Sequence, residues 1–286
     1  MAEISADAVK RLRDSTGAGM MDCKRALEEA GGDGHKAGAI LRERGLAKAV
    51  KREGRATSEG VIAIALAGRQ GALLELGCET DFVARTDAFT ALADELARAA
   101  AADARLASPS ALLSARLGAE TGEARIKAAV ARIGENIQLK RVARVEVGSG
   151  LVGGYVHAGG KLGVLVAIEA PNGVAGLDVL AKDVAMHVAA HDPTPVSVDK
   201  DGISPELLES ERAIYRKQAE GSGKPPPVIE KIVEGKLQKF IAEICLLRQA
   251  FVKDPDKTVG KLLQETGAGV RVAAFTRFKL GEGAAA

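Results

Sequence analysis

The sequence predicts an α+β fold in which two related subdomains each combine a three-stranded antiparallel sheet with helices. Three observations lead to this prediction. A hairpin pattern followed by a helix pattern occurs twice, each half closes on a similar segment, and two apolar helical stripes interrupt the second half. A chain of 286 residues is long enough for about two domains with a substantial core.

Residues 5–45 come first, and the spacing of their apolar side chains predicts three short helices. The segments Thr16-Gly-Ala-Gly19 and Gly31-Gly-Asp-Gly34 separate these helices. A unit this small is marginally stable alone, so residues 1–46 are predicted to form a module that docks on a partner. The basic stretch 47–57 is predicted to be a linker.

The first core subdomain is predicted at residues 58–148. It opens with a hairpin pattern, in which the strands Gly60 to Leu66 and Ala72 to Leu76 flank a Gly68-Arg-Gln-Gly71 turn. A helix pattern follows, and its apolar side carries Phe89, Leu92, Ala93 and Leu96.

The second core subdomain, residues 149–198 and 241–283, repeats this order. Strand patterns at 151–157 and 164–169 flank a glycine-rich turn, and the helix after them has Leu177, Leu180, Val184 and Val188 on one side. Residues 131–150 also align without a gap on residues 264–283, which pairs Gly134 with Gly267, Arg144 with Arg277, Gly148 with Gly281 and Gly150 with Gly283. Matched order and matched ends together indicate an internal duplication.

Residues 199–240 are predicted to form a helical hairpin inserted into the second subdomain. Ser204-Pro205-Glu206 is typical of a helix start, because Ser caps the first turn and Pro is tolerated at the first helical position. Gly221 to Pro227 must reverse the chain, and apolar residues recur at helical spacing on both sides of it. Two such stripes usually pack against each other, so the hairpin is expected to project from the body.

Composition excludes several classes of protein. Forty Lys and Arg against 38 Asp and Glu leave a net charge of +2, which is no electrostatic footprint for nucleic acid, although Lys48 to Arg55 is locally basic. Three scattered cysteines offer neither a disulfide framework nor a zinc spacing. The first residues lack the layout of a signal peptide, and no apolar run approaches the length of a membrane span. A cytoplasmic protein is therefore expected.

The segment Cys78-Glu-Thr-Asp-Phe-Val83 lies between a strand pattern and a helix pattern and supports two interpretations. In the first, Phe82 belongs to the core and Asp81 caps the next helix. In the second, the two side chains form an exposed apolar and acidic pair that anchors a partner. The second half has Ala170-Pro-Asn-Gly173 at the matching place, with no apolar counterpart of Phe82. The residues alone leave both interpretations open.

The sequence predicts no catalytic residue, no metal site and no cofactor. His187 and His191 are four residues apart on a predicted helix, but no third zinc ligand accompanies them, and they are expected to be partly exposed helix residues. Gly159-Gly-Lys-Leu162 lacks the Ser or Thr and the distant Gly of a phosphate-binding loop, so a hairpin turn is expected. Gly221-Ser-Gly-Lys224 fails the same test, and direct nucleotide binding is not predicted.

Three segments resemble the signature segments of the bacterial elongation factor Ts family. They are Thr16-Gly-Ala-Gly-Met-Met-Asp-Cys-Lys-Arg-Ala-Leu27, Thr80-Asp-Phe-Val83 and Phe251-Val-Lys-Asp-Pro-Asp-Lys-Thr-Val259. The similarity extends from the first helix to Gly283 in the expected order and includes the inserted helical hairpin. The segment Gly223-Lys-Pro-Pro-Pro227 at the hairpin tip is richer in Pro than the family pattern.

The resemblance implies a nucleotide-exchange factor that binds elongation factor Tu in its GDP-bound and nucleotide-free forms and has no catalytic chemistry of its own. It implies an N-terminal module of the UBA-like type. The residues Thr80, Asp81, Phe82 and Val83 would enter the GTPase domain of the partner beside its magnesium ion and dislocate that ion. His157 would contact the partner near the same region. The loop formed by Thr16, Gly17, Ala18, Gly19, Met20 and Met21, and the segment after Phe251, would be further docking surfaces.

The sequence also admits two alternatives from other classes. One is a metal-dependent hydrolase that uses His187, His191 and a carboxylate. The other is an RNA- or ribosome-associated adaptor that uses Lys48 to Arg55. The sequence also leaves open whether two copies pair through the second core subdomain.

Overall fold

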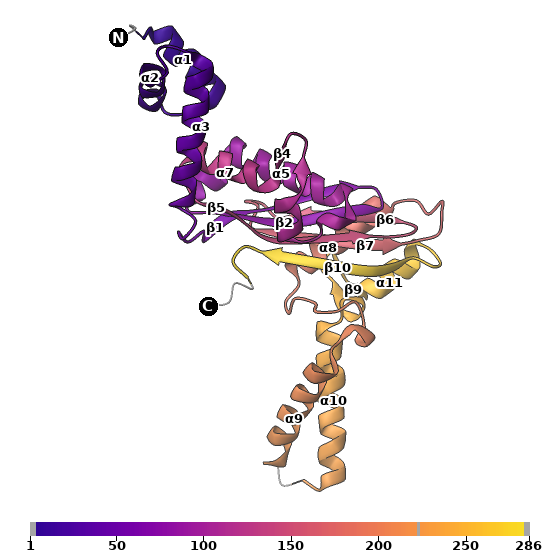
Figure 1. Ribbon diagram of the computed structural model, residues 1–286. Coiled ribbons are helices and arrows are strands. Elements are labelled where there is room, and N and C mark those ends of the chain that lie inside the picture. The colour runs from indigo at the N-terminus through magenta and orange to yellow at the C-terminus, as the bar shows by residue number, and fades with distance from the viewer. Residues whose placement is uncertain (1–3, 222–223, 283–286) are drawn as a thin grey trace.

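The computed structural model describes residues 4–221 and 224–282, and it confirms the predicted α+β class. Two three-stranded sheets lie face to face at the centre of the molecule, with helices on their outer faces. The N-terminal helices extend from one side of this body, and a long helical hairpin extends from the other (Figure 1).

The N-terminal module contains the three predicted helices, which are α1 (Ala6–Thr16), α2 (Met20–Glu29) and α3 (Gly34–Val50). Their shared core consists of Val9, Leu12, Cys23, Ala26, Leu27 and Ala37. The linker predicted at 47–57 is partly wrong, because α3 continues to Val50 before the chain turns. The alanine and lysine residues at 47–49 are strong helix formers, and they prolong the helix into the basic stretch.

The first half of the body builds the sheet β1-β2-β5 from β1 (Glu59–Ala67), β2 (Gln70–Cys78) and β5 (Ile137–Glu146), all antiparallel. Gly68, with φ 66°, takes the left-handed conformation that the tight β1–β2 turn requires. Between β2 and β5 lie α4 (Asp81–Ala84), α5 (Asp87–Ala102), α6 (Pro109–Ser114), β3 (Arg116–Leu117), β4 (Glu120–Thr121) and α7 (Gly122–Ile133).

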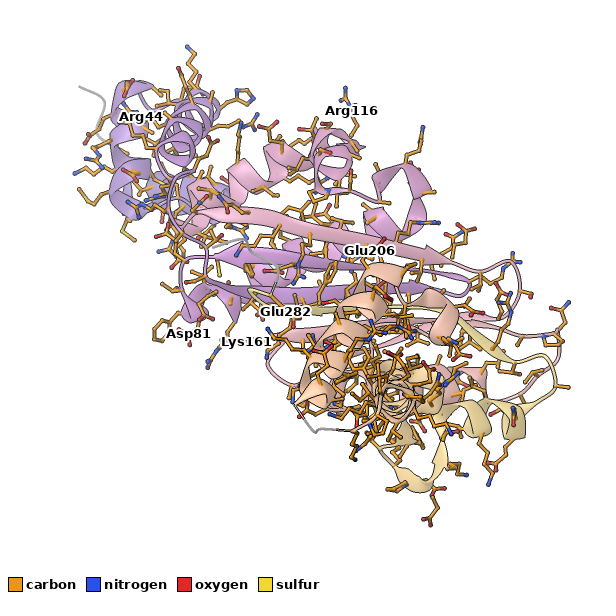
Figure 2. All side chains as sticks on the ribbon, turned by 90° about the horizontal axis from the view of Figure 1, so that it is seen from below. Arg44, Asp81, Arg116, Lys161, Glu206 and Glu282 are labelled. Atoms are coloured by element: carbon orange, nitrogen blue, oxygen red, sulfur yellow. The ribbon has the colours of Figure 1, made fainter. Side chains whose placement is uncertain are left out.

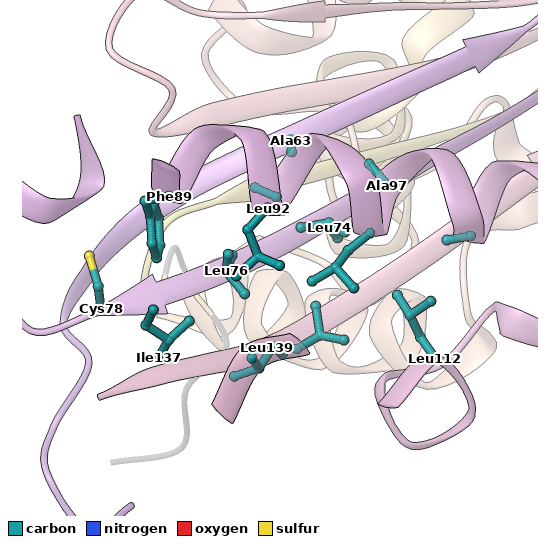
Figure 3. Packing of buried hydrophobic residues seen from close by; sticks show 14 of the residues in the cluster. Ala63, Leu74, Leu76, Cys78, Phe89, Leu92, Ala97, Leu112, Ile137 and Leu139 are labelled. Carbon is teal, nitrogen blue, oxygen red and sulfur yellow. The ribbon is translucent and has the colours of Figure 1, made fainter. Parts of the chain in front are cut away.

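Helix α5 buries its apolar side on this sheet, as its periodicity predicts. Phe89, Leu92, Ala93 and Leu96 are all buried. Figure 3 shows Phe89 and Leu92 over the sheet residues Leu74, Leu76, Ile137 and Leu139. Cys78, the last residue of β2, is also buried in this core.

The second half repeats this plan. Strands β6 (Leu151–Val156), β7 (Leu162–Glu169) and β10 (Arg271–Lys279) form the sheet β6-β7-β10, and α8 (Leu177–Ala190) covers its outer face. A small hairpin precedes the last helix of each half: β3 and β4 precede α7, and β8 (Ala250–Phe251) and β9 (Asp254–Thr258) precede α11 (Val259–Thr266).

The predicted gap-free match of the two ends agrees with these elements. Strand β5 ends at Glu146 and β10 ends at Lys279, which are matched positions in the alignment. Gly60 and Gly150 occupy similar places at the starts of the two halves. A Cβ at either residue would lie 2.2 Å from a backbone carbonyl oxygen of the middle strand of its own sheet. Gly283, the predicted partner of Gly150, lies outside the described residues.

The insertion is a helical hairpin, as predicted, formed by α9 (Pro205–Glu220) and α10 (Pro226–Ile244). The Ser204 hydroxyl accepts a hydrogen bond from the backbone N–H of Leu207, which confirms the predicted cap. The boundary placed after residue 240 falls inside α10, which continues for another turn to pack Ile241 and Ile244 against Ile203. Residues 222 and 223 of the Gly221-Ser-Gly-Lys224 turn lie outside the described residues.

The two sheets pack directly on each other. Ile62 and Leu73 of the first half are buried against Val152 and Leu165 of the second. Hydrogen bonds also join the halves, including one from the backbone N–H of Ile62 to the carbonyl oxygen of Gly160 at 2.6 Å. This contact fixes the turn between β6 and β7 beside the start of β1.

Candidate partner-binding site

Helix α4 presents Phe82 to solvent. The chain leaves the sheet at Cys78, and α4 begins at Asp81 after the cap residue Thr80, whose hydroxyl accepts from the backbone N–H of Val83 at 3.4 Å. Ala84 is buried on the core side of this single turn, whereas Phe82 is 81% exposed. The interpretation of Phe82 as a core residue is therefore wrong, because the one-turn helix directs Ala84 inward and Phe82 outward.

Asp81 does not cap the helix, since Thr80 fills that position. Its carboxylate instead forms an ion pair with the guanidinium of Arg85 at 2.9 Å. Both side chains are accessible to solvent, so this pair contributes little to stability. An acidic group is thus held next to the exposed ring of Phe82, which is the anchor geometry of the second interpretation.

Two glutamates hold the segment that leads into α4. The Glu135 carboxylate accepts hydrogen bonds from the backbone N–H groups of Glu79, at 3.1 Å, and Thr80, at 3.0 Å. It also accepts from the Thr80 hydroxyl at 2.6 Å. In return, the Glu79 carboxylate accepts from the backbone N–H of Asn136 at 2.7 Å. Reciprocal hydrogen bonds therefore join the loop before β5 to the loop after β2.

The ionisation of nearby groups follows from these contacts. The N–H of Asn136 and the guanidinium of Arg55 hold the pKa of Glu79 below its usual range, so its carboxylate remains charged. Burial and the charge of Glu135 raise the pKa of the Cys78 thiol to about 12. The thiol therefore stays protonated at neutral pH and is not a nucleophile.

The turn that carries His157 lies at the same end of the sheets as α4. Lys161 in this turn pairs with Glu59 at 2.8 Å, and Glu59 faces Cys78 in the β1–β2 ladder. Figure 2 shows Asp81 and Lys161 near each other at this end. The His157 ring is exposed, and its Nδ1 lies 2.8 Å from the Tyr155 hydroxyl. The structure thus brings the 80–83 segment and the His157 turn to one end of the molecule.

The loop 16–21 belongs to a different surface, on the N-terminal module. Gly17 ends α1 with φ 67°, and Gly19 precedes α2. Met20 and Met21 are large apolar side chains that are 55% and 64% exposed. Thr16, Ala18 and Gly19 also line a groove of about 610 Å³ between this module and α7.

The segment 251–259, predicted to be a docking surface, begins with a residue that is not accessible to a partner. Phe251 is buried on β8, and its ring centroid lies 6.0 Å from that of His187. Val252 beside it is 40% exposed, and Lys253 pairs with Asp183 at 2.6 Å. Val252 is the exposed apolar side chain at the start of the predicted docking segment.

His187 is fully buried, which corrects the expectation of a partly exposed residue. Its Nε2 lies 2.9 Å from Gln249 Oε1, and its Nδ1 accepts from the backbone N–H of Val252 at 3.2 Å. Both ring nitrogens are therefore occupied by protein groups. Within residues 4–221 and 224–282, no group of three His, Cys, Asp or Glu side chains could hold a metal ion.

Gly159 and Gly160 form the predicted hairpin turn between β6 and β7. No helix within the described ranges is long and apolar enough to cross a membrane. The basic stretch considered for RNA partly overlaps α3, and the side chains of residues 48–50 lie outside those described.

Sequence reasoning missed Glu135. The residue is 55 positions from Thr80 along the chain, so local pattern gives no indication of the contact. One signal was available in the alignment of the two halves, where Glu135 meets Ala268. The polar residue is present only in the half that carries Phe82.

Comparison with known proteins agrees with the resemblance in the signature segments. A model of the family described as Elongation factor TS matches residues 79–282. Elongation factor Ts of Chlorobium phaeobacteroides (strain BS1) is 46% identical over 291 residues, covering 98% of this chain and 100% of the relative. Elongation factor Ts of Alkalilimnicola ehrlichii is 47% identical over 282 residues, covering 98% of this chain and 93% of the relative. That of Clostridium botulinum (strain Alaska E43 / Type E3) is 42% identical over 287 residues, covering 98% and 94%.

Together with the α+β fold, these matches place the chain among the translation elongation factors. Within that class, it belongs to the elongation factor Ts family.

Proposed function

We propose that this chain binds elongation factor Tu carrying GDP and promotes release of GDP by dislocating the magnesium ion, so that GTP can bind. The observation that carries the proposal is the exposed ring of Phe82, 81% accessible on a turn held by Thr80 and Glu135. Magnesium neutralises nucleotide phosphates and orders the switch loops of GTPases. A ring inserted beside the segment that holds this ion would therefore lower the affinity for GDP.

The four residues of the motif divide between contact and support. Phe82 and Asp81 are accessible and would contact the partner, the ring in an apolar site and the carboxylate at its edge. Thr80 caps α4, and Val83 packs partly against the core of the first half. This division favours a rigid projection over a flexible loop as the contact element.

The binding free energy of Phe82 alone is too small for exchange, so additional docking surfaces are required. Burying one Phe side chain contributes about 1.5–3 kcal/mol, which corresponds to roughly tenfold to a hundredfold in an equilibrium constant. Shifting a two-state population from 1:99 to 99:1 takes about 5.5 kcal/mol. We infer that His157 and the loop 16–21, with the exposed side chains of Met20 and Met21, supply further binding free energy.

Linkage makes the exchange reversible. If this chain lowers the affinity of its partner for nucleotide, nucleotide must lower the affinity of the partner for this chain by the same factor. Nucleotide rebinding would then release the factor for another cycle, in the cytoplasm, without catalytic chemistry of its own. Pairing of two copies through the second core subdomain stays a prediction.

Release of fluorescent GDP from preloaded elongation factor Tu, chased with excess unlabelled GDP, tests the proposal. The full chain should accelerate release in a saturable manner. Chelation of magnesium should reduce this acceleration, because GDP release from the metal-free partner no longer depends on dislocating the ion. Absence of acceleration at any concentration would contradict the proposal, and an acceleration unchanged by chelation would contradict its magnesium step.

A further inference from the structure

Glu135 contacts the two residues that immediately precede α4. One carboxylate oxygen accepts from the N–H groups of Glu79, at 3.1 Å, and Thr80, at 3.0 Å, and the other accepts from the Thr80 hydroxyl at 2.6 Å. Hydrogen bonds to a charged acceptor are stronger than those between neutral groups. Three of them converge on one side chain at the point where the chain turns from β2 into α4.

This contact extends the pairing of β2 with β5 beyond its last residue pair, Cys78 with Ile137. The Glu79 carboxylate also accepts a hydrogen bond from the backbone N–H of Asn136 at 2.7 Å. Each of the two loops therefore supplies one carboxylate that accepts hydrogen bonds from the backbone of the other loop. The direction in which the chain leaves β2 is therefore fixed by the loop before β5. Helix α4 has only four residues, too few to be stable from its own hydrogen bonds.

The second half closes the same corner without a carboxylate at the position of Glu135. There the terminal strand pair, Glu169 of β7 with Arg271 of β10, forms an ion pair. The residue aligned with Glu135 is Ala268, and the loop that corresponds to 79–82 is Ala170 to Gly173. These loops lie close together, because a Cβ at Gly269 would lie 3.2 Å from Cγ of Pro171. In the second half, this corner thus closes without an equivalent of Glu135. A carboxylate at this aligned position occurs only in the half that carries the exposed Phe82.

We propose that Glu135 is a positioning residue for nucleotide exchange: it holds residues 79 and 80 so that α4 presents Phe82 in its binding orientation before the partner arrives. The inference rests on the proposed function. Phe82 is 81% exposed and has few contacts of its own to fix it, so its placement depends on the backbone that carries it. Preorganisation of an anchor reduces the ordering cost at binding.

A double-mutant cycle on the full chain tests this role, with fluorescent GDP release from elongation factor Tu as the readout. Glu135→Ala should slow the maximal release rate about tenfold, the effect of losing one or more charged hydrogen bonds. In the Phe82→Ala background, Glu135→Ala should cause little further slowing, because both substitutions act through the same ring. Glu135→Gln keeps an acceptor oxygen, so its rate of GDP release should lie between the rates of the wild type and Glu135→Ala.

Glu123→Ala serves as the matched control, since Glu123 is an exposed glutamate on the preceding helix that pairs with Lys127. It should release GDP at the wild-type rate. Hydrogen exchange provides a second readout that does not depend on the partner. Amides of residues 79–84 should exchange faster in Glu135→Ala, while amides of α5 should keep the wild-type rate.

Three outcomes are distinguishable. A wild-type rate in Glu135→Ala, or slowing by the same factor in both backgrounds, overturns the positioning role and leaves the proposed function intact. Loss of protection throughout the first half shows a general structural role instead, and it also overturns the inference. A wild-type rate in Phe82→Ala alone contradicts the proposed function itself, and the inference falls with it.

Discussion

Phe82 and Phe251 are two of six Phe residues in the chain, and the backbone around each decides its environment. Phe82 lies on a single helical turn whose inward position is taken by Ala84, so the ring is 81% exposed. Phe251 lies on a short strand that packs over α8, and its ring is buried beside His187. Both belong to signature segments, but only Phe82 can serve as an anchor for a partner without unfolding of the chain.

His187 gives the molecule a pH-dependent stability. Burial lowers the pKa of this imidazole from 6.5 to about 4. Between these two values the unfolded chain binds a proton that the folded chain does not, so stability falls as pH decreases through this window. We expect a loss of about 2 kcal/mol between pH 7 and pH 5 from this residue. Urea unfolding at both pH values should show a smaller difference in His187→Gln, and an unchanged difference would contradict the assignment.

At the scale of elements, local patterns predicted most helices and strands, and long-range contacts account for what they missed. Ser204-Pro205-Glu206 predicted the start of α9, because Ser caps a first turn and Pro is tolerated within it. The exposure of Phe82 was indicated by comparison of the two halves and by the resemblance of its segment to a family signature, and not by the local pattern. The burial of His187 was not predictable, because the residues that enclose it, Gln249 and Val252, are more than 60 positions away.

Gly235 in α10 offers a test of helix stability. It lies in the helix interior, its φ is not positive, and a Cβ there would meet no atom within 4 Å. Gly235→Ala should therefore stabilise α10 by about 0.4–1 kcal/mol, measured as slower hydrogen exchange in this helix. Gly153→Ala is the contrasting variant, because its Cβ would lie 2.4 Å from Cβ of Ala181. It should destabilise the protein, and equal effects of the two substitutions would contradict the packing described.

At the scale of the whole molecule, the duplicated halves form one body because their sheets bury apolar residues against each other. Leu73 and Leu165 are both inaccessible to solvent in this contact. The same contact places the His157 turn beside β1, at the end of the sheets where α4 begins. The two halves thus build one end of the molecule together, although only the first carries Phe82.

Leu165→Ala tests whether the halves unfold together. Removing this buried side chain should cost about 2–5 kcal/mol, as for other Leu to Ala changes in cores. Because Leu165 packs on the opposite sheet, β2 and β7 should lose hydrogen-exchange protection by the same amount. Loss confined to β7 would show that the first half is stable independently of the second.

The most direct test of the central claim compares the rate of GDP release from elongation factor Tu with wild-type chain, Phe82→Ala and the control Leu66→Ala. Leu66 is also exposed and apolar, at 49%, but it lies near the other end of β1. Both variants should fold with wild-type stability, because truncating an exposed side chain costs about 0.5 kcal/mol or less. We expect Phe82→Ala to slow release about tenfold to a hundredfold and Leu66→Ala to leave the rate unchanged. Equal rates for Phe82→Ala and the wild type, with both proteins folded, would contradict this expectation.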